Sequence, residues 1–370
     1  IALLRDDASI TLEPAGQFEL SGAPVSDVTA MVVELERHTA ELADVADDLG
    51  VKFCYVGMNP LLSADQAPRM PKARYDIMRA RMPQVGSMGL DMMHLTCTVQ
   101  VNIDFANAAE AMDMMRLGHL ATPAMIALFA NSPWRHGKST AMASRRAHVW
   151  TDVEQARCQP GAMAFDPTAT VADWVQWVAD VPMYFRASYG EDGASRYLDV
   201  PWGTTFRHYL ERGIDGVRPT LADWELHLST VFPDVRLKRF IELRAADCVP
   251  VALLPALPAL SKGLFYDETS RRAALALLED VHVDRAALRA AACRAGLEGR
   301  VGAHHLGEQA RALIALAGAG LGRLAAEFGA DPAADAALDR LAAIAHGDAE
   351  PLWRRCDRLL GARPSLLALL

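Results

Sequence analysis

The stretch Thr96-Cys-Thr-Val-Gln-Val-Asn-Ile-Asp-Phe105 alternates polar and apolar residues over its whole length. Successive side chains of a β-strand point to opposite faces of the sheet, so this alternation predicts a strand with two unlike faces. The polar face would carry Thr96, Thr98, Gln100, Asn102 and Asp104, and the apolar face Cys97, Val99, Val101, Ile103 and Phe105. A sheet built from such strands packs one side on the core and presents the other to solvent or to a ligand.

Two further stretches share this pattern. In the predicted strand Arg236–Arg244, one face carries Arg236, Lys238, Phe240, Glu242 and Arg244, and in Gln17–Leu20 one face carries Gln17 and Glu19. An ordinary half-exposed antiparallel sheet would explain these faces. Amide and guanidinium groups beside carboxylates are also what a site needs to hold a zwitterionic amino acid. The pattern alone leaves both interpretations open.

Apolar residues at helical spacing fill much of the remaining chain. The clearest case is Ser26–Leu49, where Ser26 can cap the start of a helix and Gly50 can end it. The other expected elements are an extended segment at Ser9–Leu20, a short strand at Val51–Val56, two helices within Ala106–Ala130, a helix at Asp223–Val231, a strand at Val235–Arg244 and several helices from about Arg271 to Leu370. Helices between non-consecutive strands predict an α+β fold.

Composition limits the possible partners. The 370 residues carry a formal net charge of −9 and no cluster of Lys and Arg, which argues against a nucleic acid partner. The longest apolar runs, Val251–Leu260 and Ala312–Leu321, are too short to cross a bilayer. The six cysteines are scattered without metal-type spacing, as expected for free thiols in a reducing compartment. We therefore expect a cytoplasmic protein without a membrane or nucleic acid partner.

Several stretches, in one order from about Ile10 to Asp267, together resemble the plant-type glutamate–cysteine ligases, which also occur in bacteria. They are Glu13–Pro24, Met70–Arg79, Val85–Met93, Thr96–Phe105, Ala127–Pro133, Asp180–Phe185, Phe232–Asp247 and Gly263–Asp267. The resemblance implies a glutamine-synthetase-like fold, in which a curved antiparallel sheet forms a funnel with flanking helices. It implies a catalytic domain over residues 1–270, from which an N-terminal part is missing, and a helical C-terminal region over residues 271–370.

The resemblance also implies roles for individual residues. It assigns metal-binding carboxylates to Glu13, Glu19 and Glu242, and catalytic guanidinium groups to Arg244 and Arg146. Arg244 would face phosphate or substrate, and Arg146 would pair with a substrate carboxylate. The remaining substrate-binding residues would be Thr98, Gln100, Asn102, Trp150 and Tyr184.

The reaction implied by the resemblance suits these residue types. A carboxylate acylates an amine only after activation, so ATP would phosphorylate the glutamate side chain with the help of Mg²⁺, and the amine of cysteine would attack the acyl phosphate. The expected partners are glutamate, cysteine and ATP, bound by a monomer or a homodimer. Two alternatives stay open: a glutamate ligase for another amine, and a non-catalytic relative that binds nucleotide. The run Cys248–Leu254, where the family commonly has a Gly-rich stretch and an Arg pair, slightly favours the second alternative.

Overall fold

The computed structural model describes residues 2–189, 195–280, 282–363 and 369. Two three-stranded antiparallel sheets lie near its centre. One has the order β1-β2-β3, with β1 at Ala2–Arg5, β2 at Ala8–Leu12 and β3 at Phe18–Ser21. The other has the order β4-β10-β9, with β4 at Val101–Ile103, β9 at Val235–Leu237 and β10 at Ile241–Leu243. Small antiparallel sheets among many helices confirm the α+β class.

The remaining strands form two-stranded ribbons. Their pairs are β5 (Trp134–Arg135) with β6 (Lys138–Ser139), β7 (Phe185–Tyr189) with β8 (Ser195–Asp199), and β11 (Arg300–Val301) with β12 (His304–His305).

Two of the predicted strands are absent or broken in the structure. Residues 51–56 form no strand. Val235–Arg244 is a hairpin rather than one strand, because the chain turns at Lys238 and the backbone N–H of Lys238 donates to the carbonyl of Phe240. Leu237 then faces Ile241 and Arg236 faces Glu242, so positions of equal parity stay on one face. The expected polar face therefore survives although the strand is broken.

The predicted strand at Thr96–Phe105 is shorter than expected. Regular pairing begins only at Val101. Before it, Thr96 forms a single bridge with Met58, and Thr98 forms one with Asp247. This segment is therefore held to three parts of the chain in turn rather than to one neighbouring strand.

Two long helices flank the sheets. α1 covers Val28–Leu49 and is capped by Asp27, one residue after the expected Ser26, and Gly50 ends it with φ 64°. α4 covers Ala108–Phe129 as one helix where two were expected, with Pro123 inside it. Burial explains its continuity, because its second half is buried on all sides and packing offsets the hydrogen bond that proline cannot donate.

The other helices are shorter or lie toward the C-terminus. They are α2 (Ala73–Arg81), α3 (Gly89–Leu95), α5 (Arg145–Val149), α6 (Gln155–Cys158), α7 (Val171–Asp180), α8 (Phe206–Arg212), α9 (Leu221–Leu228), α10 (Ala256–Ser261), α11 (Glu268–Leu278), α12 (Arg285–Ala295), α13 (Leu306–Phe328), α14 (Pro332–His346) and α15 (Leu352–Ala362). No helix among the described residues is long and apolar enough to cross a membrane.

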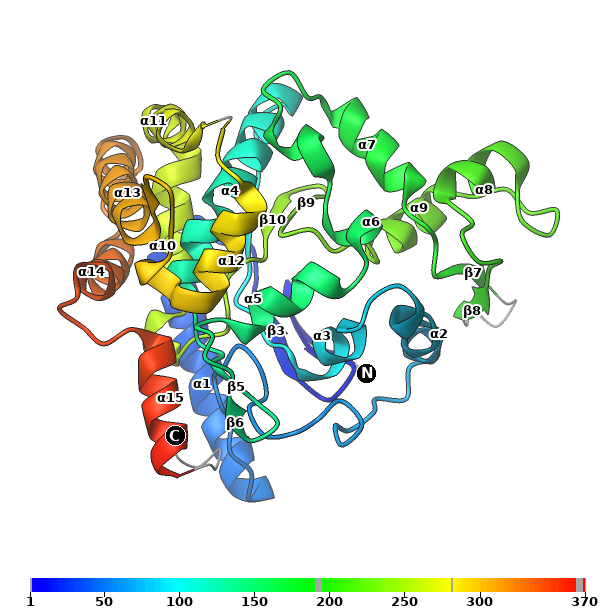
Figure 1. Cartoon of the computed structure of the whole chain (residues 1–370), viewed down its shortest axis with the longest axis horizontal. Helices are drawn as coiled ribbons and strands as arrows, with labels where there is room; N and C mark the ends of the chain where they lie inside the picture. Colours follow the sequence, from blue (N-terminus) through cyan, green and yellow to red (C-terminus); the bar gives the residue numbers. More distant parts are fainter. Residues whose placement is uncertain (1, 190–194, 281, 364–368, 370) are drawn as a thin grey trace.

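The largest apolar core contains buried residues from both the N-terminal and the C-terminal parts of the chain. In Figure 1, α10, α11, α13 and α14 gather on one side of the central strands, and α7, α8 and α9 lie on the other side. Buried residues of α4, β4 and β10 form one cluster with buried residues of α10 to α14. The boundary expected after residue 270 falls inside α11. The helical C-terminal region therefore packs directly behind the sheet that carries the polar face.

Candidate active site

Polar side chains form a row across the second sheet. Glu242 on β10 lies directly opposite Asn102 on β4 and opposite Arg236 on β9. One step along, Arg244 Nη1 donates to Gln100 Oε1 at 3.2 Å. The structure therefore brings together Gln100, Asn102, Glu242 and Arg244, four of the residues that the sequence singled out.

Three cations surround the Glu242 carboxylate. Its Oε2 atom accepts from Arg236 Nε at 2.7 Å and from Arg244 Nη1 at 2.9 Å, while Oε1 accepts from Lys238 Nζ at 3.3 Å. Burial alone would raise the pKa of Glu242, but Arg244, Arg236 and Lys238 together lower this pKa to about 2. Glu242 is therefore an ionised member of a salt-bridge cluster. We call Arg236, Lys238 and Arg244 the basic half of the site.

Arg236 is the structural member of this half. Its side chain is only 6% exposed. Its Nη1 atom donates to the carbonyl of Val231 at 2.9 Å and lies 3.4 Å from those of Leu228 and Ser229, where α9 ends. Burial lowers the pKa of Arg236 to about 10, which leaves it charged at neutral pH. Arg236 therefore fixes the position of Glu242 relative to the end of α9.

The first sheet contributes an acidic half, formed by Glu13 and Glu19. Glu19 on β3 faces Thr11 on β2, and Glu13 lies two residues beyond Thr11, so the two carboxylates are diagonal neighbours on one face. Burial, and next the charge of Glu13, raise the pKa of Glu19, while Arg244 and Lys238 act in the opposite direction. These influences place Glu19 beside the basic half. Gln17, just before β3, ties the first sheet to the helix α3, because its side-chain amide donates to the carbonyl of Met93 at 3.3 Å.

The three predicted metal ligands do not converge as a set. Among residues 2–189, 195–280, 282–363 and 369, no three His, Cys, Asp or Glu side chains gather in a way that could hold a metal ion. Both oxygens of Glu242 accept from Arg or Lys, so a metal would have to displace a cation there. Glu13 and Glu19 are the two predicted ligands that are diagonal neighbours on one face of a sheet.

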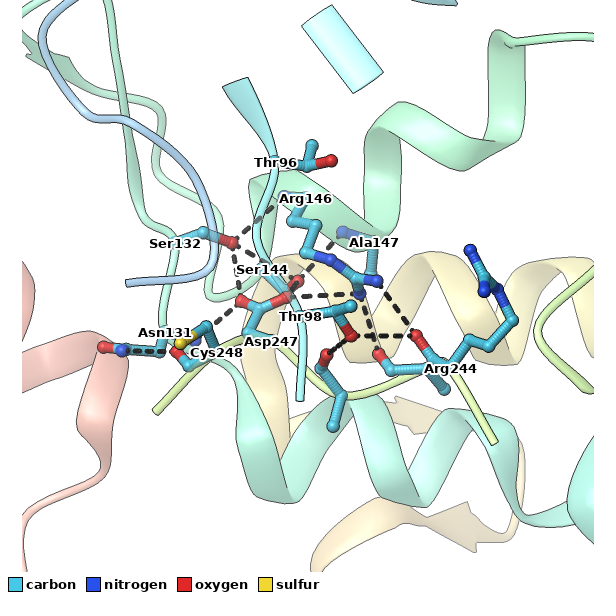
Figure 2. A network of polar contacts seen from close by, with 12 residues as sticks. Thr96, Thr98, Asn131, Ser132, Ser144, Arg146, Ala147, Arg244, Asp247 and Cys248 are labelled. Carbon is cyan, nitrogen blue, oxygen red and sulfur yellow. Dashed lines mark hydrogen bonds and ion pairs between the residues drawn. The ribbon is translucent and has the colours of Figure 1, made fainter. Parts of the chain in front are cut away.

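Arg146 lies in a second polar network, next to the first (Figure 2). Its side chain is 3% exposed, and its Nη1 and Nη2 atoms donate to the carbonyls of Ala245 and Arg244 at 3.2 and 2.9 Å. Nη1 also lies 3.8 Å from Asp247 Oδ1. Figure 2 shows the Arg244 side chain pointing away from this network. In this structure Arg146 therefore holds the backbone beside Arg244, whereas the family resemblance implied contact with a substrate carboxylate.

Asp247 is the centre of that network. Its carboxylate accepts from the backbone N–H of Asn131 at 2.8 Å, from Ser132 Oγ at 2.6 Å and from Ser144 Oγ at 2.9 Å. Thr98 Oγ1 donates to the carbonyl of Ala246 at 2.6 Å, so the hydroxyl expected to bind substrate is used within the protein. The network joins the end of α4, the start of α5 and the segment after β10.

Tyr184 and Trp150 lie apart from the polar row of Gln100 and Arg244. Tyr184 belongs to a separate apolar cluster, and Trp150 packs against that cluster. Tyr184 donates to Glu154 Oε2 at 3.0 Å, and the guanidinium carbon of Arg157 lies 3.7 Å from the centre of its ring. Burial raises the pKa of Tyr184, so its hydroxyl keeps its proton. Tyr184 lines a cavity of about 230 Å³, while Trp150 packs edge-on against Phe232.

Sequence reasoning missed the roles of three residues. Arg236 and Lys238 were placed on the polar face but were assigned no role, although two cations that alternate with a later Glu are the pattern of a cross-strand salt bridge. Asp247 was noted only within a matching stretch. Its partners Ser132 and Ser144 belong to no recognisable motif, so no local sequence pattern predicts that they contact Asp247.

These features define an α+β protein with a sheet face that combines amides, carboxylates and guanidinium groups. Comparison with known proteins identifies the class: the profile of glutamate-cysteine ligase family 2 (GCS2) matches residues 2–338, and the chain belongs to this family. This confirms the resemblance stated on the sequence.

Curated relatives agree with the profile. The chain is 44% identical over 283 residues to the chloroplastic glutamate–cysteine ligase of Brassica juncea, covering 76% of this chain and 54% of that protein. The Arabidopsis thaliana enzyme gives 44% identity over 283 residues, 76% of this chain and 53% of that protein. Ligase B of Oryza sativa subsp. japonica gives 42% over 273 residues, 73% of this chain and 54% of that protein. The chain spans about half the length of these relatives.

The relatives correct one expectation. The scattered cysteines led us to expect a cytoplasmic protein, but the matching curated ligases are chloroplastic proteins. Scattered cysteines are compatible with any reducing compartment, so they were not a sufficient basis for that expectation.

Proposed function

We propose that the complete protein joins the side-chain carboxylate of glutamate to the amine of cysteine at the expense of ATP, the first step of glutathione synthesis. Membership of the family supports this function. The structural observation that carries it is the division of the polar face into a basic half and an acidic half, because each substrate or reaction intermediate is anionic or zwitterionic.

The two halves suit different parts of the ligands. A glutamate carboxylate or a phosphate group would lie against Arg244, whose fork of donors matches such oxygens. Gln100 and Asn102, in the same row, offer amide donors and acceptors to the amino acid. We propose that the two central sheets belong to one curved wall of a funnel in residues 1–270, with residues 271–370 supporting it from behind.

In the proposed reaction, the γ-phosphoryl group of ATP passes to a side-chain carboxylate oxygen of glutamate and ADP leaves. The amine nitrogen of cysteine then attacks the acyl carbon, the carbon–oxygen bond to phosphate breaks, and the amine gives up a proton. The protein forms no covalent bond in either step. Its contribution is to hold the reactants together and to oppose negative charge with Arg244 and the neighbouring cations.

Magnesium is the proposed companion of ATP. Mg²⁺ is commonly bound by one or two carboxylates together with substrate phosphates and water, so the pair Glu13 and Glu19 fits it without a third protein ligand. When bound, the ion would neutralise phosphate charge during transfer. Glu242 is not among the proposed ligands, because both of its carboxylate oxygens accept from Arg or Lys side chains.

The test is ADP release from the full-length protein with ATP, Mg²⁺ and glutamate across a panel of amines. Release that depends on cysteine supports the proposal. Release that depends on a different amine would replace cysteine as the acceptor. Nucleotide binding without turnover on any amine would overturn the proposed activity and favour a binding role.

A further inference from the structure

The two oxygens of the Glu242 carboxylate differ in the number of cations that contact them. Arg236 and Arg244 both bond to Oε2, at distances from 2.6 to 2.9 Å. Lys238 alone bonds to Oε1, at 3.3 Å, the longest contact in the cluster. The two guanidinium groups already carry more positive charge than one carboxylate carries negative charge, so the stability of the cluster does not require the third cation.

Lys238 is also the least buried of the three cations. Its side chain is 28% exposed, against 6% for Arg236 and 14% for Arg244. It begins the turn between β9 and β10, and its Nζ lies 5.6 Å from the centre of the Phe240 ring. A flexible four-carbon chain at a turn can change its rotamer at little cost, whereas Arg236 is tied to backbone carbonyls.

The anionic part of the site lies within reach of this side chain. Lys238 Nζ lies 3.3 Å from Glu242 Oε1 on the polar face, and Lys238 and Arg244 both act electrostatically on Glu19 of the first sheet, so the ammonium group lies near the acidic half. We infer that Lys238 is a ligand-binding residue that leaves Glu242 Oε1 and contacts an anionic oxygen of the bound substrate. Arg236 and Arg244 keep Glu242 in place when it does so. This inference rests on the proposed function.

The anionic oxygen can belong to glutamate or to the phosphate chain of ATP, and the test separates the two. Calorimetric titrations of the full chain in EDTA would measure the dissociation constants of L-glutamate and of inorganic tripolyphosphate separately. The variants are Lys238→Met, Lys238→Gln and Lys238→Arg. The matched control is Arg239→Met, which removes one positive charge from the next residue of the same turn, where the side chain is 87% exposed and pairs with Glu225.

We expect Lys238→Met and Lys238→Gln to weaken one of the two ligands by about tenfold or more, the effect of losing one charged hydrogen bond. Lys238→Arg should recover most of that binding, and Arg239→Met should change it less than about twofold. Melting temperatures close to that of the original chain would show that the fold survives. Unchanged binding of both ligands by Lys238→Met, or an equal loss in Arg239→Met, would overturn the inference. Failure of the original chain to bind either ligand would overturn the proposed function as well.

Discussion

Arg236 Nη2 lies 2.6 Å from Glu242 Oε2 across the hairpin formed by β9 and β10, at directly opposite positions of the two strands. Both side chains are almost completely buried. The orientation of this carboxylate therefore comes from the hairpin itself and needs no bound ion. Separating the pair would leave a buried charge without a partner, which costs more than the pair contributes when it is intact.

Replacement of Glu242 by Gln should destabilise the protein by about 3 kcal/mol, because Arg236 would stay buried without an opposing charge. Turnover should fall as well, since Arg244 loses the group that holds it beside Gln100. Urea unfolding followed by circular dichroism measures the first effect. Glu225→Gln is the control, because it breaks an exposed pair with Arg239 and should cost less than about 1 kcal/mol. Equal stability of the two variants would contradict the role given to Glu242.

The same carboxylate should make stability depend on acid pH. The pKa of Glu242 is about 2 in the folded protein and 4.5 as its ordinary value, so its contribution is complete above pH 4.5 and is lost as the pH falls toward 2. Between pH 6 and pH 3.5 this group alone should remove about 1 kcal/mol of stability. Urea unfolding across that range should therefore be steeper in pH for the original chain than for Glu242→Gln. Parallel curves would rule out this origin.

The sequence predicted the polar face because strand alternation depends only on local backbone geometry. It placed Arg236 and Glu242 on one face correctly, although it took a hairpin for one strand. A turn from Leu237 to Ile241 preserves parity, so alternation alone does not distinguish the two cases. The failed strand at Val51–Val56 has a different cause: an apolar run becomes a strand only if a partner strand is available.

The network around Asp247 was beyond local reasoning for a different reason. Its members come from residues 98 to 248 and meet only because α4, α5 and the segment after β10 pack together. The same holds for Arg146, whose hydrogen-bond acceptors are backbone carbonyls that any sequence would supply. Resemblance can mark such a residue as important, but its contacts have to be read from the fold.

Close approach of Gly57 to Asp247 gives a test of that network. A Cβ atom at position 57 would lie 2.5 Å from Asp247 Cγ, and the carboxylate is held by three donors and has no room to move. Gly57→Ala should therefore destabilise the protein by about 1–3 kcal/mol. Gly318→Ala is the matched control, because this glycine lies in α13 with open space around it, and alanine should stabilise the helix by roughly 0.5–1 kcal/mol. Thermal unfolding of both variants should show shifts of opposite sign.

Arg289 on α12 gives a test of the helical C-terminal region. Its guanidinium forms an ion pair with Asp234, just before β9, and its Nη2 donates to the carbonyl of Ala147 in α5 at 3.1 Å. Arg289→Met should cost on the order of 2 kcal/mol and lower turnover, because Asp234, whose side chain is 21% exposed, would lose its ion pair and the hairpin would be loosened. Arg272→Met breaks an exposed pair with Glu268 and should change neither quantity appreciably. Unfolding and ADP release of the two variants, measured together, would show whether this region supports the site.

The last prediction separates the two arginines that share Glu242 Oε2. Arg236 also donates to backbone carbonyls at the end of α9, whereas Arg244 donates to Gln100 and is more exposed. Lysine keeps one charge but offers no fork of donors.

Arg236→Lys should therefore lower stability by about 2 kcal/mol, because carbonyls at the end of α9 lose their donor. Its KM for glutamate should change little in the fraction that stays folded. Arg244→Lys should leave urea unfolding nearly unchanged, because an ammonium group can still pair with Glu242. It should raise the KM for glutamate or ATP by about tenfold, because an ammonium group cannot bind a carboxylate or phosphate with two parallel donors. Steady-state kinetics and unfolding of both variants test this division, and a stability loss in Arg244→Lys as large as that in Arg236→Lys would make Arg244 a structural residue and remove it from the site.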